Sequence, residues 1–319
     1  YDVDGIHIDD YFYPYPAAGQ TIADDQEFRR YGGGFANKND WRRNNVSAFV
    51  QQLGQTIKDR KPWVKFGVSP FGIYRNKKSD PVNGSATSGL QNYDDLYADV
   101  LLWVNKGWVD YCVPQLYWKI GHPAADYQTL AIWWNKYAGN RPLYIGESVE
   151  KTVKEPDLKN PATNQMEAKF KLRRMLPNVQ GAVLWYAKAV ADNMGSYGTA
   201  LRTYYWKTPA LQPLMPFIDH KRPKKPKHLE AVWTEDGLVL FWEEPKGKRW
   251  GDFAQKYVVY RFAPGEDIDI ENPAKIVAIT HDNWIKLPYN KGEVKYTYVV
   301  TALDRMSNES RKAKKKVLL

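Results

Sequence analysis

Two adjacent carboxylates near the start of the chain are the residues best suited to chemistry. Asp9 and Asp10 directly follow an apolar stretch over residues 2–8 that has the pattern of a short buried strand. An aromatic cluster comes next, formed by Tyr11, Phe12, Tyr13 and Tyr15. Sugar rings pack their C–H faces on flat aromatic surfaces while their hydroxyls bond to carboxylates, so this combination indicates a carbohydrate site. The alternative is that these acids merely cap the loop that follows.

Glycoside hydrolysis usually requires two carboxyl groups, about 5–5.5 Å apart for retention and about 6.5–9.5 Å apart for inversion. Asp9 is the first choice for an ionised nucleophile or base, because alternation along the strand places it on one face with His7 and Tyr11. The second acid is either the adjacent Asp10 or Glu147, which ends a later apolar strand. His7 is either a ligand of the sugar or a core histidine.

The positions of these acids depend on a run of alternating strands and helices that extends to residue 206. Five nearly continuous apolar strands are expected, at 2–8, 64–70, 109–118, 142–147 and 181–187. That pattern predicts an α/β fold with a parallel sheet, built as the C-terminal part of an eight-stranded (β/α) barrel. The first strand would then lack a neighbour, which predicts either coverage by residues outside this sequence or self-association through that strand.

Polar and aromatic side chains follow the ends of the expected strands, where barrels keep their active sites. As substrate-binding residues we therefore predict His7, Tyr11, Tyr13, Arg75, Gln115, Tyr117, Trp118 and Trp185. The alternative for each aromatic residue is a place in the barrel core.

The pattern changes after residue 219, which predicts a boundary between a domain over 1–219 and a second over 220–319. A linker rich in lysine and proline over 221–227 leads into short alternating strands, as in an all-β sandwich. The ending resembles a fibronectin type III module through Tyr298, Val300, Ala302, Asp304, Asn308 and Ser310. Trp233 and Trp242 are expected in the sandwich core.

Composition sets limits on function. Aromatic residues make up 14% of the 319 residues, which favours either carbohydrate contact or an aromatic core. The single cysteine excludes an internal disulfide, and no apolar stretch is long enough to span a membrane. The net charge is +10, but the sequence contains no nucleic-acid-binding motif. The basic runs at 221–227 and 311–316 are expected to keep a linker and a tail solvated. No metal-binding motif or cofactor is indicated.

Six blocks of sequence together resemble the glycosyl-hydrolase-like family 10, a group of bacterial envelope proteins with (β/α)₈ barrels. They are YDVDGIHIDDYFYPYP, YGGGFANKNDWRRNNV, KFGVSPFGIYRN, GWVDYCVPQLYW, LYIGE and GAVLWYAK. The resemblance implies cleavage of an envelope glycan such as the sugar strands of peptidoglycan, and an extracytoplasmic location. The chain opens inside a strand, and its missing half-barrel would leave such an active site incomplete, so we expect this chain alone to be inactive.

Three interpretations therefore compete. The chain is a glycoside hydrolase, a non-catalytic glycan-binding envelope protein, or a structural envelope module that works through its fibronectin-like domain. Activity on a polysaccharide would separate the first two. Loss of glycan binding on removal of Trp118 or Trp185 would separate the second from the third.

Overall fold

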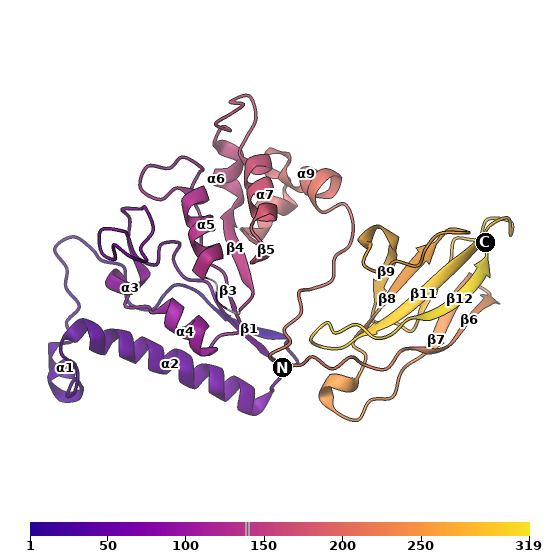
Figure 1. Cartoon of the computed structure of the whole chain (residues 1–319), viewed down its shortest axis with the longest axis horizontal. Helices are drawn as coiled ribbons and strands as arrows, with labels where there is room; N and C mark the ends of the chain where they lie inside the picture. Colours follow the sequence, from indigo (N-terminus) through magenta and orange to yellow (C-terminus); the bar gives the residue numbers. More distant parts are fainter. Residues whose placement is uncertain (138, 140) are drawn as a thin grey trace. The chain divides into compact units, whose positions relative to one another are not determined.

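The chain forms two compact units, Tyr1–Tyr205 and Trp206–Leu319, in a computed structural model that describes residues 1–137, 139 and 141–319 (Figure 1). The division falls earlier than the sequence boundary between 219 and 220. Residues 206–226 belong with the second unit because they pack on it: Leu211 contacts its core, and the main-chain oxygen of Asp219 accepts a hydrogen bond of 3.2 Å from the Asn308 side chain.

The first unit is built on a parallel sheet whose strands follow one another in chain order. Its strands are β1 (Gly5–Ile8), β2 (Lys65–Val68), β3 (Tyr111–Cys112), β4 (Leu143–Ser148) and β5 (Val179–Trp185). The predicted α/β fold with a parallel sheet is therefore confirmed. Strand β3 is much shorter than the expected 109–118, because Pro114 has no N–H to continue the ladder. Beyond it, Gln115 makes single bridges to Phe71, which follows β2, and to Gly146 in β4.

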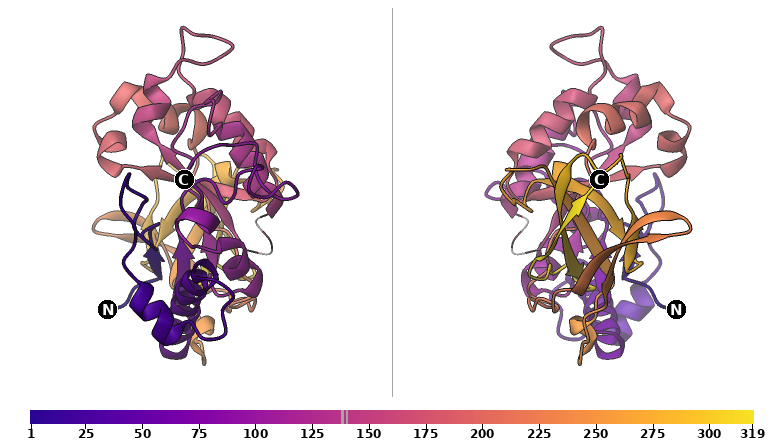
Figure 2. Two further views of the ribbon diagram at one scale, coloured as in Figure 1. Left: turned by 90° about the vertical axis from the view of Figure 1, so that its left-hand side faces the viewer. Right: turned by 90° about the vertical axis from the view of Figure 1, so that its right-hand side faces the viewer.

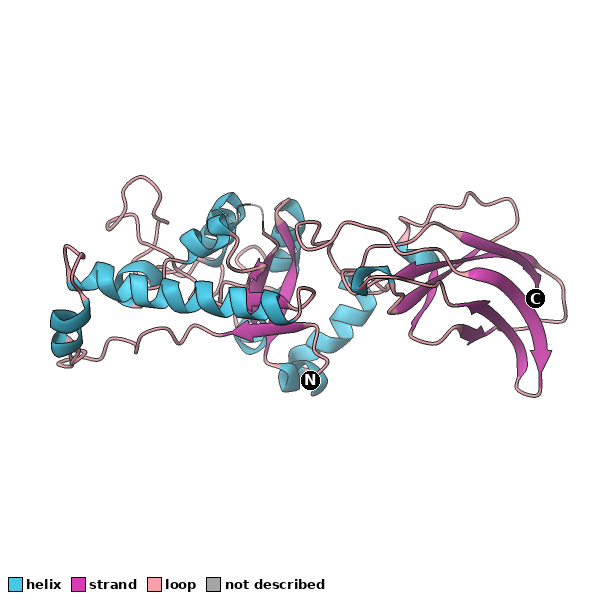
Figure 3. Ribbon diagram, turned by 90° about the horizontal axis from the view of Figure 1, so that it is seen from below, coloured by secondary structure: helices cyan, strands magenta, loops and turns pink. Residues whose placement is uncertain are grey.

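Buried side chains of α2, α4, α5 and α7 pack on one face of this sheet, and α2 is the longest helix of the first unit (Figure 3). The helices of this unit are α1 (Asp25–Tyr31), α2 (Lys38–Arg60), α3 (Asn92–Asp95), α4 (Val100–Lys106), α5 (Tyr127–Tyr137), α6 (Val149–Lys154), α7 (Met166–Met175), α8 (Ala187–Ala191) and α9 (Tyr197–Ala200). The side chain of Asn37 caps α2 by accepting the N–H of Asp40, and Gly107 ends α4 in the left-handed conformation at φ +69°.

Alternation along the strands gives the sheet two different faces. Phe66, Val68 and Ile145 point toward the helices and are completely buried there. The opposite face is partly open to solvent. A Cβ atom on Gly67 would lie 2.0 Å from the ring of Tyr111, so only glycine fits beneath that ring on the open face.

The sheet is open in the part of the chain that the structure describes, with β1 and β5 as its edges. Ile6 on β1 and Val183 on β5 are accordingly exposed. The predicted self-association through the first strand stays a prediction. None of the helices in the described ranges is both long and apolar enough to cross a membrane.

The second unit is a sandwich of two antiparallel sheets, in the arrangement of a fibronectin type III module (Figure 2). One sheet has the order β10-β7-β6 and the other β12-β11-β8-β9. The strands are β6 (Lys227–Thr234), β7 (Gly237–Glu243), β8 (Lys256–Phe262), β9 (Ile276–Thr280), β10 (Trp284–Lys286), β11 (Lys295–Leu303) and β12 (Ala313–Leu318).

The turn after β11 explains the polar residues Asp304, Asn308 and Ser310 of the fibronectin-like signature. The carboxylate of Asp304 accepts the N–H groups of Met306 and Asn308 and the side-chain amide of Asn308, at 2.8–2.9 Å. The hydroxyl of Ser310 accepts the N–H of Ala302 at 2.9 Å. The polar residues of the signature therefore form the turn that follows β11.

The two tryptophans expected in the sandwich core differ in burial. Trp242 is completely buried between the sheets, as expected. Trp233 is 62% exposed, so its assignment to the core was wrong. It lies at the end of the β6–β7 hairpin, opposite Leu238, beyond the last layer of the core.

We expect Trp242→Ala to lower the free energy of unfolding of the second unit by about 3–5 kcal/mol, because it removes a large buried ring and leaves a cavity. Trp233→Ala is the matched control and should cost about 1 kcal/mol or less. Urea unfolding followed by circular dichroism measures both. Equal losses for the two variants would contradict the assignment of one ring to the core and the other to the surface.

Candidate functional site

Asp9 lies exposed at the carboxyl end of β1, and the side chain of Gln115 holds it. The Gln115 amide donates one hydrogen bond to Asp9 Oδ1 and another, of 3.0 Å, to the main-chain oxygen of Ser69. Three neighbouring strand ends thus fix one carboxylate. The structure brings Asp9 and Gln115 together, as expected of residues that serve one site.

Asp10 has a different environment, although it is the next residue. It is only 4% exposed, and its Oδ2 accepts a hydrogen bond from the hydroxyl of Tyr15. Its own N–H donates to Asp9 Oδ1 at 2.9 Å. Burial raises the pKa of Asp10 and the Tyr15 hydrogen bond opposes that rise, while the nearby charge of Asp9 raises the pKa further. The pair therefore combines an open carboxylate with a sheltered one that retains its proton more readily.

An aromatic pocket lies near the two acids, whose charges act on its Tyr117, although neither acid lines it. Tyr117 and Trp185 stack with their ring centres 6.5 Å apart and line a cavity of about 360 Å³ together with Ser148, Glu150, Lys151, Lys154 and Glu155. Burial raises the pKa of Tyr117 to about 12, and the charges of Asp9 and Asp10 add to this rise. Trp185 is exposed, so a sugar ring could pack on its face.

Glu147, predicted as one choice for the second acid, does not face this pocket. It alternates with Leu143 and Ile145 along β4 and so points toward the helices, where it is 0% exposed. Its carboxylate pairs with Arg173 and accepts hydrogen bonds from Tyr197 at 3.0 Å and Thr152 at 3.1 Å. The structure thus places the Glu147 side chain on the helix side of the sheet, away from the open face that carries Asp9.

Charge keeps this buried glutamate ionised. Burial alone would raise the pKa of Glu147, but the positive charges of Arg173 and Lys169 bring it below its usual range. Lys169 donates to Thr152 at 2.8 Å, and burial lowers its pKa to about 8. The cluster of Glu147, Thr152, Lys169 and Arg173 joins β4 to α6 and α7 and has a structural role.

Three of the predicted binding residues support loops instead of meeting the acids. The guanidinium of Arg75 pairs with Asp94, with its nearer contact at 2.8 Å. The ring of Tyr13 packs edge-on against Tyr97. The half-buried ring of Trp118 packs edge-on against Phe71, which in turn contacts Tyr15. Trp118 is therefore linked to Asp10 only indirectly, through Phe71 and then Tyr15.

The two remaining predicted residues lie on the open side. Tyr11 is exposed beside the acids. His7 stacks on Tyr111 with ring centres 5.7 Å apart, and its Nδ1 lies 3.1 Å from the Tyr111 hydroxyl. Burial lowers the pKa of His7, while the charge of Asp9 opposes that change. His7 thus shares the open face with Asp9, as alternation predicted.

Sequence reasoning missed two residues that contribute to this region. Tyr15 was part of the aromatic cluster but was not assigned to the site, and it contacts Asp10. Ser148 lines the pocket because β4 ends one residue later than expected. The signal that could have found Ser148 is its alternation with Tyr144 on the open face.

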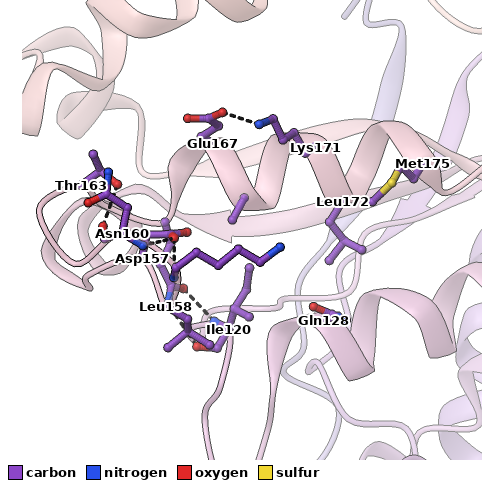
Figure 4. Close-up of a pocket in the computed structure, with 13 residues that line it drawn as sticks. Ile120, Gln128, Asp157, Leu158, Asn160, Thr163, Glu167, Lys171, Leu172 and Met175 are labelled. Carbon is purple, nitrogen blue, oxygen red and sulfur yellow. Dashed lines mark hydrogen bonds and ion pairs between the residues drawn. The ribbon is translucent and has the colours of Figure 1, made fainter.

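A larger cavity, of about 580 Å³, lies between α7, the start of α5 and the loop around residues 157–163 (Figure 4). Neither Asp9 nor Asp10 lines it. Three of its charged side chains have local partners: Glu167 pairs with Lys171 at 2.5 Å, and Asp157 accepts the N–H groups of Lys159 and Asn160. Across the described ranges, no three His, Cys, Asp or Glu side chains gather as a metal site requires.

The fold and site are those of an α/β protein with strand-end carboxylates, followed by a fibronectin-like sandwich. Residues 1–164 match the family described as Glycosyl hydrolase-like 10. The chain is 39% identical over 323 residues to Glycosyl hydrolase YngK of Bacillus subtilis (strain 168), which covers 99% of this chain and 62% of YngK. It is 41% identical over 192 residues to Glycosyl hydrolase DigH of Escherichia coli (strain K12), covering 58% of this chain and 43% of DigH.

The chain belongs to the Glycosyl hydrolase-like 10 family, which confirms the resemblance of the six sequence blocks. It spans less than two thirds of the length of these relatives. Among solved structures, a Fn3-like protein from Clostridium thermocellum matches 30% of this chain and 92% of its own at 23% identity and a TM-score of 0.23. Chitinase ChiA74 from Bacillus thuringiensis matches 98% of this chain and 58% of its own at 11% identity and a TM-score of 0.36.

We expect Glu147→Gln to lower the free energy of unfolding of the first unit by about 3–5 kcal/mol, because it leaves the Arg173 charge buried without its counter-ion. Glu150→Gln, which removes one partner of the solvent-exposed pair with Lys154, is the control and should leave stability essentially unchanged.

The same variant should change how stability depends on pH. The pKa of Glu147 is lowered in the folded state, so its stabilisation is present above the unfolded-state pKa and is lost as pH falls through the folded-state pKa. Urea unfolding between pH 7 and pH 3 should show a smaller loss for Glu147→Gln than for the wild type. Parallel losses for both proteins would exclude Glu147 as an important source of the acid sensitivity.

Proposed function

We propose that the protein is a glycoside hydrolase and that Asp9 and Asp10 are its acid pair in this chain. The observation that carries the proposal is the unequal environment of two adjacent carboxyl groups beside an open aromatic pocket. Groups whose environments push their pKa values apart are suited to opposite roles in acid–base catalysis. Membership of a glycosyl-hydrolase-like family supports the same reaction class.

Hydrolysis adds water across the C–O bond between two sugars, and each carboxyl group has one task in this proposal. Asp10, sheltered and with a raised pKa, gives its proton to the glycosidic oxygen as that bond breaks. Asp9, held by Gln115, acts in one of two ways: it takes a proton from the water that attacks the anomeric carbon, or it bonds to that carbon and is then displaced by water, which gives a proton back to Asp10. Tyr117 and Trp185 supply the surface on which a sugar ring of the substrate packs.

The substrate that we propose is a β-linked, N-acetylated glycan of the bacterial envelope, such as the sugar strands of peptidoglycan. The family relationship and the bacterial relatives named as glycosyl hydrolases support this choice. Because peptidoglycan lies outside the cytoplasmic membrane, the proposal places the protein there.

A second candidate function is glycan binding without cleavage. The observation that favours it is the burial of Glu147, because β1 is then the source of both proposed acids in the described part of the chain. In that case the pocket beside Trp185 would bind the glycan and no bond would break. The two functions predict the same binding and different products.

Asp9→Asn should cut turnover by several orders of magnitude, since a positioned nucleophile or base supplies roughly 4–8 kcal/mol of barrier reduction. Asp10→Asn should cut it by about 10²–10⁴-fold, as expected for loss of a general acid. Asp192→Asn, an exposed carboxylate that pairs with Lys188, is the matched control and should keep wild-type activity.

The assay is release of reducing ends from peptide-free glycan strands, in the longest form of the protein that contains these 319 residues. Near-normal activity of Asp9→Asn would refute its role. A wild type that binds the strands but releases no reducing ends would favour the binding function.

Tyr15→Phe should move the pH profile of the hydrolase in a defined direction. The Tyr15 hydrogen bond lowers the pKa of Asp10, so its loss raises that pKa. The general acid then stays protonated to higher pH, and the basic limb of the activity profile should shift upward. Tyr11→Phe, at an exposed ring beside the same acids, is the control and should leave that limb in place. An unshifted limb in Tyr15→Phe would argue against Asp10 as the acid.

A further inference from the structure

Two exposed aromatic rings form a corner at one end of the second unit. Trp233, near the end of β6, is 62% exposed, and Tyr289, in the loop after β10, is 48% exposed. Their ring centres lie 4.7 Å apart, and the ring planes meet at 75°. The corner is thus a preformed pair with a substantial part of both rings open to solvent.

Packing of the sandwich does not account for this corner. Alternation along β6 places Trp233 on the same face of the strand as Leu229 and Ala231. Trp233 lies farther along the strand, at the end of the hairpin, where it pairs with Leu238. Leu238 and Leu287 already close the core at that level, where both are buried. The large ring of Trp233 therefore remains largely in water, although burial of an apolar ring is favourable.

The surroundings of the corner suit a sugar. The turn directly after Trp233 carries Glu235 and Asp236, both exposed and without an ion pair among the described residues. Free carboxylates accept hydrogen bonds from sugar hydroxyls, while the C–H face of a pyranose ring packs against an aromatic face. An aromatic face beside free acceptors is the combination that recognises carbohydrate.

We propose that the corner of Trp233 and Tyr289 binds a sugar residue of the polymeric glycan and retains the polymer on the protein. This inference rests on the proposed function for the kind of polymer, and it adds a second binding site, distinct from the two acids and from the pocket of Tyr117 and Trp185. A protein partner is disfavoured, because stable interfaces bury about 800 Å² on each side and have cores depleted of charge. Two rings beside two free carboxylates do not form such a surface.

The second unit offers a matched control for nonspecific binding of the glycan to any exposed aromatic ring. Trp284 is 49% exposed, and its alternation in β10 puts it on the face of the sheet that points away from the core. It differs from Trp233 mainly in its place on the sandwich. Trp284→Ala therefore removes a comparable exposed ring without touching the corner.

The test is retention of the whole chain on chitin beads and on purified peptidoglycan sacculi, with Asp9→Asn present throughout so that no cleavage occurs. Trp233→Ala and Tyr289→Ala should each weaken retention about fivefold to tenfold, the loss expected for one aromatic contact. Trp284→Ala should retain wild-type binding. Trp185→Ala should weaken binding independently, and its effect should multiply with that of Trp233→Ala.

Equal weakening by Trp284→Ala and Trp233→Ala would overturn the proposal, as would full retention by both corner variants. Absence of wild-type retention on both polymers would overturn it too. Circular dichroism melts of each variant separate lost binding from lost folding, and Tyr289→Phe, which keeps the ring, should restore retention. Failure of the hydrolase proposal would appear separately, as unchanged reducing-end release in Asp9→Asn.

Discussion

The alternation of side chains along the parallel strands decides which carboxylates of this protein can meet a substrate. Helices cover one face of the sheet, so a residue pointing that way is sealed, and its neighbour in the strand faces the open side. Asp9 and Glu147 both lie at carboxyl ends of strands, yet this constraint separates them completely. One is exposed and held by an amide, whereas the other is buried and held by a guanidinium.

The buried cluster around Glu147 supports the site without belonging to it. An ion pair in the interior loses much of its hydration energy, so it is tolerated only where hydrogen bonds satisfy the remaining lone pairs. Tyr197 and Thr152 supply such bonds to Glu147. The cluster thereby connects α6 and α7 with β4, whose next residue, Ser148, lines the aromatic pocket. Stability on the helix side and access on the open side thus depend on adjacent positions of one strand.

Much of the architecture was predictable because it follows from local patterns. The order of strands and helices, the parallel sheet, the sandwich and its final turn could all be inferred from periodicity and from short motifs. Asp9 could be placed because the first strand ends at Ile8, where the pattern predicts, although it begins at Gly5 and is shorter than expected. Glu147 could not, because alternation shows that two strand residues lie on opposite faces but does not show which face the helices cover. Arg75 was predicted to bind substrate, and its pairing with Asp94 could not be foreseen, because Asp94 approaches through loop geometry that no periodicity encodes.

The most informative irregularity is the early end of β3. Pro114 interrupts the ladder, and the next residue, Gln115, bridges to Phe71 on one side and Gly146 on the other. Because the backbone of Gln115 is held on both sides, its side chain can reach across β2 to Asp9 at little further cost in conformational entropy. A regular strand would have continued the ladder between the same neighbours. The departure from regular structure therefore gives the exposed carboxylate a fixed position, which a catalytic or binding carboxylate in an otherwise open cleft requires.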